Sequence, residues 1–220
     1  MHTVTVIGFD EAYASAITGA LDLFSLAGVA WEHMQGEPGE RRFRVQLASR
    51  GGRPVNCINH IGLSDSIPLE AVEHTDLLLV PTIGGPIERV LANNRELLPI
   101  LRRHHEAGAD LASNCSGAFL LAEAGLLDGR EATTHWGYAE QFRQRYPQVN
   151  LTPEKLITWQ DNVYSSGGGM AWLDLALLLI ERYGGHDLAM RTAKAQVLDR
   201  GRGSQAAYTS LRPKKYHQDP

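Results

Sequence analysis

Apolar residues follow two patterns along the chain, short runs and longer stretches with helical spacing. The run from Asp76 to Pro81 is nearly continuous, which is typical of a central parallel strand covered on both faces. The stretch from Thr3 to Gly8 predicts a short buried strand. Apolar residues that recur every three or four positions from Ala14 to Ala27 predict a helix directly after it. A strand followed by a helix indicates a βα unit.

The same alternation continues along most of the chain. Further strands are predicted at Phe43 to Ala48, Val55 to Ile61, Asp110 to Asn114, Leu156 to Gln160 and Val163 to Ser165. Further helices are predicted at Ile87 to Glu106, Ala118 to Ala124, Tyr138 to Tyr146 and from the glycines at 167–169 to Tyr183. Because Gly51, Gly52 and Pro54 separate the first two of these strands, we expect that pair to form a hairpin or a sheet edge. The alternation predicts an α/β fold whose mostly parallel sheet has helices on both faces.

Composition limits the class of protein and its organisation. With 43% hydrophobic and 21% charged residues, the 220-residue chain can bury one sizeable core, which excludes disorder as its main state. A formal net charge of −4 excludes a strongly basic protein that coats nucleic acid. The end of the chain is rich in basic residues and has little apolar periodicity. We therefore expect one domain over residues 1–199 and a linker or tail over residues 200–220.

The cysteines and the start of the chain predict a cytoplasmic protein. Cys57 and Cys115 are far apart and have neither disulfide-framework nor zinc-ligand spacing, so we expect free thiols and no metal site. The first residues enter a strand-like run without the basic region of a signal peptide. No apolar stretch reaches the roughly 18 residues that a membrane span needs, so no membrane partner is expected.

The segment from Ser113 to Ala118 carries the strongest chemical signal. A strand that ends in a nucleophile, here Cys115, and continues through small residues into a helix is typical of a strand-turn-helix elbow. The start of that helix directs amide groups at the thiol, which favours a thiolate. A nucleophile or a thiol-lined ligand pocket would follow. The alternative is a buried structural cysteine, because free cysteine is among the most buried residue types.

Other candidate residues are expected at the same rim of the sheet, because carboxyl ends of parallel strands lie at one edge. His135 could act as a general base towards Cys115, or it could simply make a local hydrogen bond beside Trp136. The amides of Gly84 and Gly85 could form an oxyanion hole or an anion site, or a plain turn from strand to helix. The polar rim also includes Asn114 and Ser116, which are candidates for contact with a small polar ligand. The glycines at 167–169 lack dinucleotide-binding spacing, and we expect no cofactor.

Several of these stretches together resemble a known family. Residues 113–130, 132–136, 164–176 and 199–205 are similar to segments of the ThiJ/PfpI superfamily, whose fold is shared with glutamine amidotransferases. More narrowly, they resemble the N-terminal amidase-like domain of AraC-type transcriptional regulators. The resemblance implies a flavodoxin-like, three-layer α/β sandwich that is commonly dimeric. It also implies a small pocket lined by Cys115, His135 and the amides near Gly84 and Gly85.

The resemblance favours a sensor over an enzyme. In enzymatic relatives an acidic side chain near the start of the first helix engages the cysteine, whereas the matching position here is Ala16. The expected function is an effector-sensing domain with a small-molecule effector, a homodimer, and DNA bound through a helix-turn-helix module after this chain. The alternative is a cysteine-dependent hydrolase or hydratase of a small amide, nitrile-like or carbonyl compound. A third possibility is an oligomerisation scaffold with a vestigial pocket.

Overall fold

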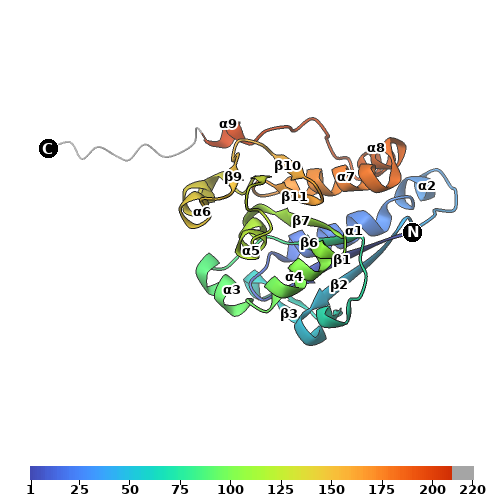
Figure 1. The fold of residues 1–220 in the computed structure, drawn as a ribbon. Helices are drawn as coiled ribbons and strands as arrows, with labels where there is room; N and C mark the ends of the chain where they lie inside the picture. The colour runs from blue at the N-terminus through green and yellow to red at the C-terminus, as the bar shows by residue number, and fades with distance from the viewer. Residues whose placement is uncertain (210–220) are drawn as a thin grey trace.

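The computed structural model describes residues 1–209 as one α/β unit built around a twisted sheet (Figure 1). Residues 210–220, which include Arg212, Lys214 and Lys215 of the predicted tail, lie outside the described residues. Within the described part the sheet has seven strands in the order β10-β11-β7-β6-β1-β2-β5. Every neighbouring pair is parallel except β10 and β11. The strands are β1 (His2–Gly8), β2 (Phe43–Ser49), β5 (Ile67–Pro68), β6 (Leu77–Val80), β7 (Asp110–Asn114), β10 (Ile157–Gln160) and β11 (Val163–Ser166).

Helices cover both faces of this sheet, which gives the three-layer sandwich that the resemblance implies. One face is covered by α1 (Ala14–Leu26) and α7 (Ala171–Gly184), with α2 (Ala30–Met34) and α8 (His186–Ala195) beside them. The opposite face is covered by α3 (Ile87–Asn93), α4 (Leu97–Glu106) and α5 (Ala118–Glu123). Two short helices lie near the end of the sheet at β10, α6 (Ala139–Arg145) and α9 (Ala206–Thr209). The predicted flavodoxin-like α/β class is confirmed.

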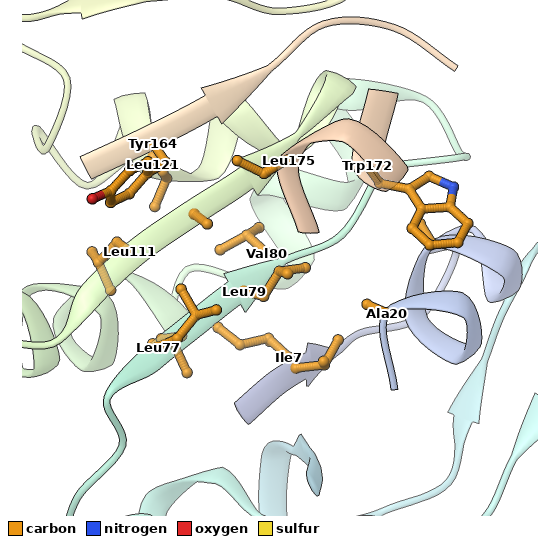
Figure 2. Close-up of a cluster of buried hydrophobic side chains, with 14 of the residues drawn as sticks. Ile7, Ala20, Leu77, Leu79, Val80, Leu111, Leu121, Tyr164, Trp172 and Leu175 are labelled. Atoms are coloured by element: carbon orange, nitrogen blue, oxygen red, sulfur yellow. The ribbon is translucent and has the colours of Figure 1, made fainter. Parts of the chain in front are cut away.

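The core consists of the apolar runs that the sequence pattern predicts as strands. Leu77, Leu79 and Val80 of β6 are all buried, and Figure 2 shows them between side chains from β1, β7 and the flanking helices. Helices α1 and α7 approach each other closely where Gly19 faces Trp172. A Cβ atom at Gly19 would lie only 2.2 Å from the Trp172 ring. The position of Trp172 therefore depends on a glycine in the facing helix.

The expected hairpin after β2 is wrong. Strand β2 pairs in parallel with β1 and with β5, whereas β3 (Val55–Asn56) pairs with β4 (Gly62–Leu63) in a separate antiparallel ribbon. All seven residues of β1 find a partner in β2, and helix α1 carries the chain back between the two strands. Parallel pairing therefore satisfies more of the β2 backbone than pairing with the two-residue strand β3 would. The turn between β3 and β4 is a 3₁₀ segment that contains Asn59 at φ +61°.

The single helix predicted from Ile87 to Glu106 is divided into α3 and α4. Pro99 cannot donate a helical hydrogen bond, so it is tolerated only in the first turn of a helix, and α4 begins two residues before it. Asn94 ends α3, and its Nδ2 donates to the carbonyl of Val90 at 2.8 Å, a local bond that competes with helix continuation. Helix α8 has no counterpart among the predicted elements.

Because His104 is buried, we expect the protein to lose stability in mild acid. Burial is the main cause that lowers its pKa below 6.5, and the nearby positive charge of Arg103 and His74 lowers it further. The unfolded chain therefore takes up a proton at a pH where the folded protein resists it, so stability is complete above about pH 7.5 and falls as the pH drops through 6.5. We expect a slope approaching about 1.4 kcal/mol per pH unit for this one proton.

Urea denaturation between pH 5 and pH 8 measures this dependence. His104→Gln should flatten the curve, whereas His33→Gln should leave it unchanged because His33 is exposed on α2. Equal slopes for the wild type and His104→Gln would contradict the assignment.

Candidate functional site

Cys115 occupies the strand-turn-helix elbow. It follows β7 directly, begins the 3₁₀ segment η4 (Cys115–Gly117) and leads into α5. Its φ of +56° lies in the left-handed region, which costs a residue with a side chain about 1 kcal/mol or more. Thr134 Oγ1 donates to the Cys115 carbonyl at 2.8 Å, and Ser116 Oγ donates to the Ile83 carbonyl at 2.8 Å. These bonds hold a strained backbone that presents the thiol above the sheet edge.

A cavity of about 330 Å³ opens beside this elbow. Tyr13, Tyr138 and Met170 line it with substantially exposed side chains, whereas the Cys115 side chain is buried. The cavity therefore has an aromatic and apolar entrance and a buried thiol. Its lining is formed by Tyr13, Ser15, Ala16, Thr82, Ile83, Gly84, Cys115, Ser116, His135, Gly137, Tyr138, Gly169, Met170 and Trp172.

The structure does not leave the Gly84 and Gly85 amides free for a ligand. Both N–H groups donate to the carbonyl of Glu11, at 2.7 and 3.2 Å. Glu11 has φ +66°, and the bridge between Ala12 and Ile83 brings the two loops together, so this carbonyl is held against the glycines. Gly84 still lines the cavity, whereas Gly85 does not. Because both amides already donate to Glu11, Gly84 and Gly85 do not form the expected oxyanion hole or anion site in this structure.

Asn114 lies behind the cavity and not in its lining. It is completely buried, its Nδ2 donates to Thr82 Oγ1 at 2.5 Å, and its Oδ1 accepts from Ser166 Oγ at 2.8 Å. These bonds connect β7 with β11 and with the loop after β6. Asn114 therefore positions the elbow, and both polar atoms of its side chain already have partners within the protein.

His135 lines the cavity as a hydrogen-bond donor. Its Nδ1 accepts from the Gly137 N–H at 2.9 Å, and burial lowers the pKa of the ring, so the imidazole is neutral at pH 7. A neutral imidazole has one proton, which must then be on Nε2. General-base catalysis requires an accepting nitrogen, and the accepting nitrogen of His135 is already occupied by a backbone amide. The His135 ring lies tilted against Trp136 and edge-on to Tyr138, at centroid distances of 5.3 and 5.8 Å.

The cavity lining offers the thiol no acidic partner. Ala16 is buried and contributes a methyl group to the wall. The two acidic residues nearest in sequence are engaged elsewhere: Asp10 accepts from the backbone N–H of Asn56 at 2.8 Å, and Glu11 pairs with Arg89. Of the described residues, none that lines the cavity has a carboxylate.

Residues 1–209 contain neither a metal-ligand cluster nor a membrane-spanning helix. In that range no group of three histidine, cysteine or acidic side chains is arranged to hold a metal ion. Nor does any helix there combine the length and the hydropathy of a membrane span.

Sequence reasoning missed part of the cavity. Tyr13 and Tyr138 reach it from the N-terminal end of α1 and from the 3₁₀ segment η5 (Trp136–Tyr138), and no motif marks either tyrosine. Trp172 could have been found, because it lies within one of the segments that carry the family resemblance.

Comparisons with known proteins agree with this architecture. The DJ-1/PfpI family model matches residues 21–182. The chain is 34% identical over 176 residues to the HTH-type transcriptional regulator CdhR of Pseudomonas aeruginosa, covering 80% of this chain and 48% of CdhR. It is 31% identical over 147 residues to an isonitrile hydratase of Pseudomonas putida, covering 66% of this chain and 62% of that enzyme. The crystal structure of an AraC family transcriptional regulator from Pseudomonas putida superposes with a TM-score of 0.72 at 23% identity, covering 89% of this chain and all of that one (100%).

This chain is shorter than the curated regulators. It spans about half the length of CdhR, 48%, and a similar share, 44%, of the regulator GbdR of the same species. The family model alone covers most of the chain, residues 21–182. With its three-layer α/β fold and its elbow cysteine, this chain belongs to the DJ-1/PfpI family.

Proposed function

We propose that this chain is the effector-sensing domain of an AraC-type transcriptional regulator and that it binds a small molecule in the Cys115 cavity. One observation carries the proposal: the cavity holds a buried thiol, but neither a carboxylate nor a free accepting imidazole nitrogen to activate it. The similarity to CdhR over 80% of the chain points the same way. The site is therefore equipped for binding and poorly equipped for nucleophilic catalysis.

The cavity suits a small metabolite that has a hydrogen-bond acceptor. Its volume of about 330 Å³ is at the lower end of the range of ligand pockets. The Nε2–H of His135 supplies a donor, and the aromatic entrance supplies apolar contact. Under this proposal the protein acts in the cytoplasm as a homodimer and binds DNA through a helix-turn-helix module that follows residues 200–220.

A cysteine-dependent hydratase or hydrolase is the second candidate. It is favoured by the strained backbone at Cys115, which resembles that of a nucleophile elbow, and by the similarity to an isonitrile hydratase. Turnover would require His135 to turn so that an unoccupied nitrogen faces the thiol. That rotation would break its bond with Gly137.

A metabolite panel separates the two candidates. We expect a small polar compound that, at a hundredfold excess over its Kd, raises the free energy of unfolding by about 2.7 kcal/mol in thermal-shift measurements. The compound should be recovered unchanged, and Cys115→Ala should still bind it. Consumption of the compound that depends on Cys115 would instead support the enzyme.

Gly168→Ala tests whether the compound occupies this cavity. A Cβ atom there would lie 2.1 Å from His135 Cδ2, so it must displace the imidazole, and we expect the ligand-induced shift to disappear. Gly62→Ala is the matched control, because nothing lies within 4 Å of its Cβ position. The DNA-binding part of the proposal is tested by a promoter reporter with the complete reading frame. A reading frame that ends at Pro220 would overturn this part.

A further inference from the structure

Residues 199–205, here called the return segment, pack back against the domain after α8. In Figure 1 the chain leaves α8 and runs back past α7 to α9, which lies near β10 and the short strand β9 (Asn150–Leu151). The return segment pairs with the loop before β10, where the Gln205 N–H donates to the Glu154 carbonyl at 2.9 Å and Ser204 forms an antiparallel bridge with Lys155. On α7, Arg202 pairs with Asp174.

Gln205 is buried at the end of this segment, with only 3% of its surface exposed. Its Oε1 accepts from the Gly168 N–H at 3.0 Å, and its Nε2 donates to the Thr134 carbonyl at 2.8 Å. A glutamine in a polar stretch is normally solvated, so burial with both ends of the amide hydrogen-bonded indicates a specific docking position. The fit is close, because a Cβ atom at Gly167 would lie 2.6 Å from the Gln205 amide.

The two partners of Gln205 lie directly beside the cavity in sequence. Thr134 precedes His135 and also donates to the Cys115 carbonyl, whereas Gly168 precedes Gly169 and Met170, which line the cavity as well. One side chain outside the lining therefore joins two separate segments that both contribute residues to the Cys115 cavity. Helix α9 continues from Gln205 and packs beside η5, the segment that follows His135.

We infer that Gln205 is a latch that couples the state of the Cys115 cavity to the position of the chain after residue 205. A ligand that moves one of these segments relative to the other must lengthen a hydrogen bond to the buried Gln205 amide, which cannot follow both segments at once. The biological meaning of the latch rests on the proposed function, in which the chain after residue 205 leads to a DNA-binding module. The coupling between Gln205 and the cavity does not rest on the proposed function, because it is a property of these residues alone.

Thermodynamic reciprocity makes the latch testable without an effector. If the cavity acts on Gln205, then releasing Gln205 must act on the cavity by the same coupling free energy. The probe is the alkylation of Cys115 by iodoacetamide at a low reagent concentration, where the rate is proportional to the equilibrium fraction of molecules whose thiol is accessible. Peptide-level mass spectrometry follows it in the wild type and in Gln205→Ala. We expect an increase of about tenfold for Cys115, within the range of typical allosteric coupling.

Two controls separate coupling from general loosening. Cys57 is also buried, and burial together with Asp10 raises the pKa of its thiol, so it reports global opening within the same sample. Arg200→Ala removes another contact of the return segment, the pair between Arg200 and Glu181, at a distance from the cavity walls. The latch predicts faster alkylation of Cys115 only in Gln205→Ala, with Cys57 and Arg200→Ala within about twofold of the wild type. Equal acceleration of both cysteines, or equal effects of the two variants, would overturn it.

Gln205→Glu keeps the experiment decisive if the alanine variant does not fold. It preserves the acceptor for Gly168 but loses the donor to Thr134, so it should accelerate Cys115 alkylation by releasing the segment that contains Thr134 and His135. No acceleration in this variant would also overturn the latch. A failure to find an effector or a DNA-binding module would reject the proposed function and leave this measurement unaffected.

Discussion

Gly117→Ala should cost the protein about 3 kcal/mol or more of its free energy of unfolding. A Cβ atom at Gly117 would lie 2.5 Å from the Pro81 carbonyl oxygen and 2.8 Å from that of Val80. Both neighbours are backbone atoms at the end of a central strand, so they cannot move aside as a flexible side chain would. The turn after Cys115 must open, and the thiol loses its position above the sheet.

Urea denaturation of the purified variant measures this loss. Because domains of this size are typically stable by about 5–15 kcal/mol, the variant should unfold at much lower urea concentration or be partly unfolded in buffer. Gly62→Ala is the control, because its Cβ position is open and its stability should change by less than about 1 kcal/mol. A Gly117→Ala protein as stable as the wild type would show that the elbow tolerates a wider turn than this structure implies.

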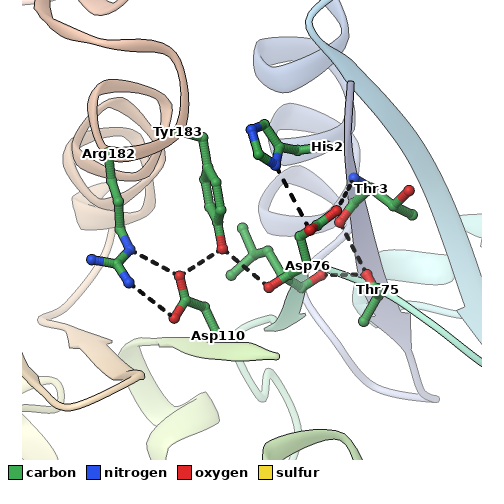
Figure 3. Close-up of polar contacts among 8 residues, drawn as sticks. His2, Thr3, Thr75, Asp76, Asp110, Arg182 and Tyr183 are labelled. Atoms are coloured by element: carbon green, nitrogen blue, oxygen red, sulfur yellow. Dashed lines mark hydrogen bonds and ion pairs between the residues drawn. The ribbon is translucent and has the colours of Figure 1, made fainter. Parts of the chain in front are cut away.

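Asp110→Ala is expected to cost about 3 kcal/mol, at the lower end of the range for breaking a buried ion pair. Asp110 accepts from Arg182 Nε at 2.9 Å and from the Tyr183 hydroxyl at 2.6 Å, so it joins the amino end of β7 to the end of α7 (Figure 3). Half of the Arg182 side chain is exposed, 50%, so Arg182 can turn to water and the loss is smaller than for a fully buried pair. Tyr183 has less freedom to turn to water. Burial is the main cause that raises the pKa of its hydroxyl, and its hydrogen bond to Asp110 raises the pKa further.

The same urea experiment tests this network. Glu40→Ala removes the exposed pair between Glu40 and Arg42 and should change stability by at most about 1 kcal/mol. Asp110→Asn retains the shape and one acceptor, so its loss should lie between those of the alanine variant and the control. If Asp110→Ala and Glu40→Ala have equal effects, the network contributes no more than a surface pair.

Elements with a strong local pattern could be predicted from the sequence. The apolar run before Pro81 predicted β6, and the small residues after Asn114 predicted the elbow, because both depend on neighbours in the chain. The partner of β2 could not be predicted in this way. Pairing depends on which edge of β1 is free, and this is a contact between residues about forty positions apart.

In the candidate site, too, some residues could be predicted from the sequence and others could not. Cys115, Ser116 and His135 were predicted and do line the cavity, because the carboxyl ends of parallel strands meet at one edge. Asn114 and Gly85 have residue types that suit a ligand, but other protein groups occupy their polar atoms. Residue type shows what a side chain can donate or accept, and only the packed structure shows whether a partner already satisfies it.

The sequence by itself determined the α/β class, the elbow at Cys115 and the absence of an acid at Ala16, because each follows from residue identity or local spacing. The tertiary structure alone decided that the Gly84 and Gly85 amides are occupied and that His135 is a donor. It also decided that Gln205 is buried behind the cavity. The physical reason is that a hydrogen bond is settled by which groups meet in space. The partners of the Gly84 and Gly85 amides and of Gln205 meet only when distant segments pack. The His135 bond to Gly137 is local, but the burial that keeps its ring neutral comes from tertiary packing.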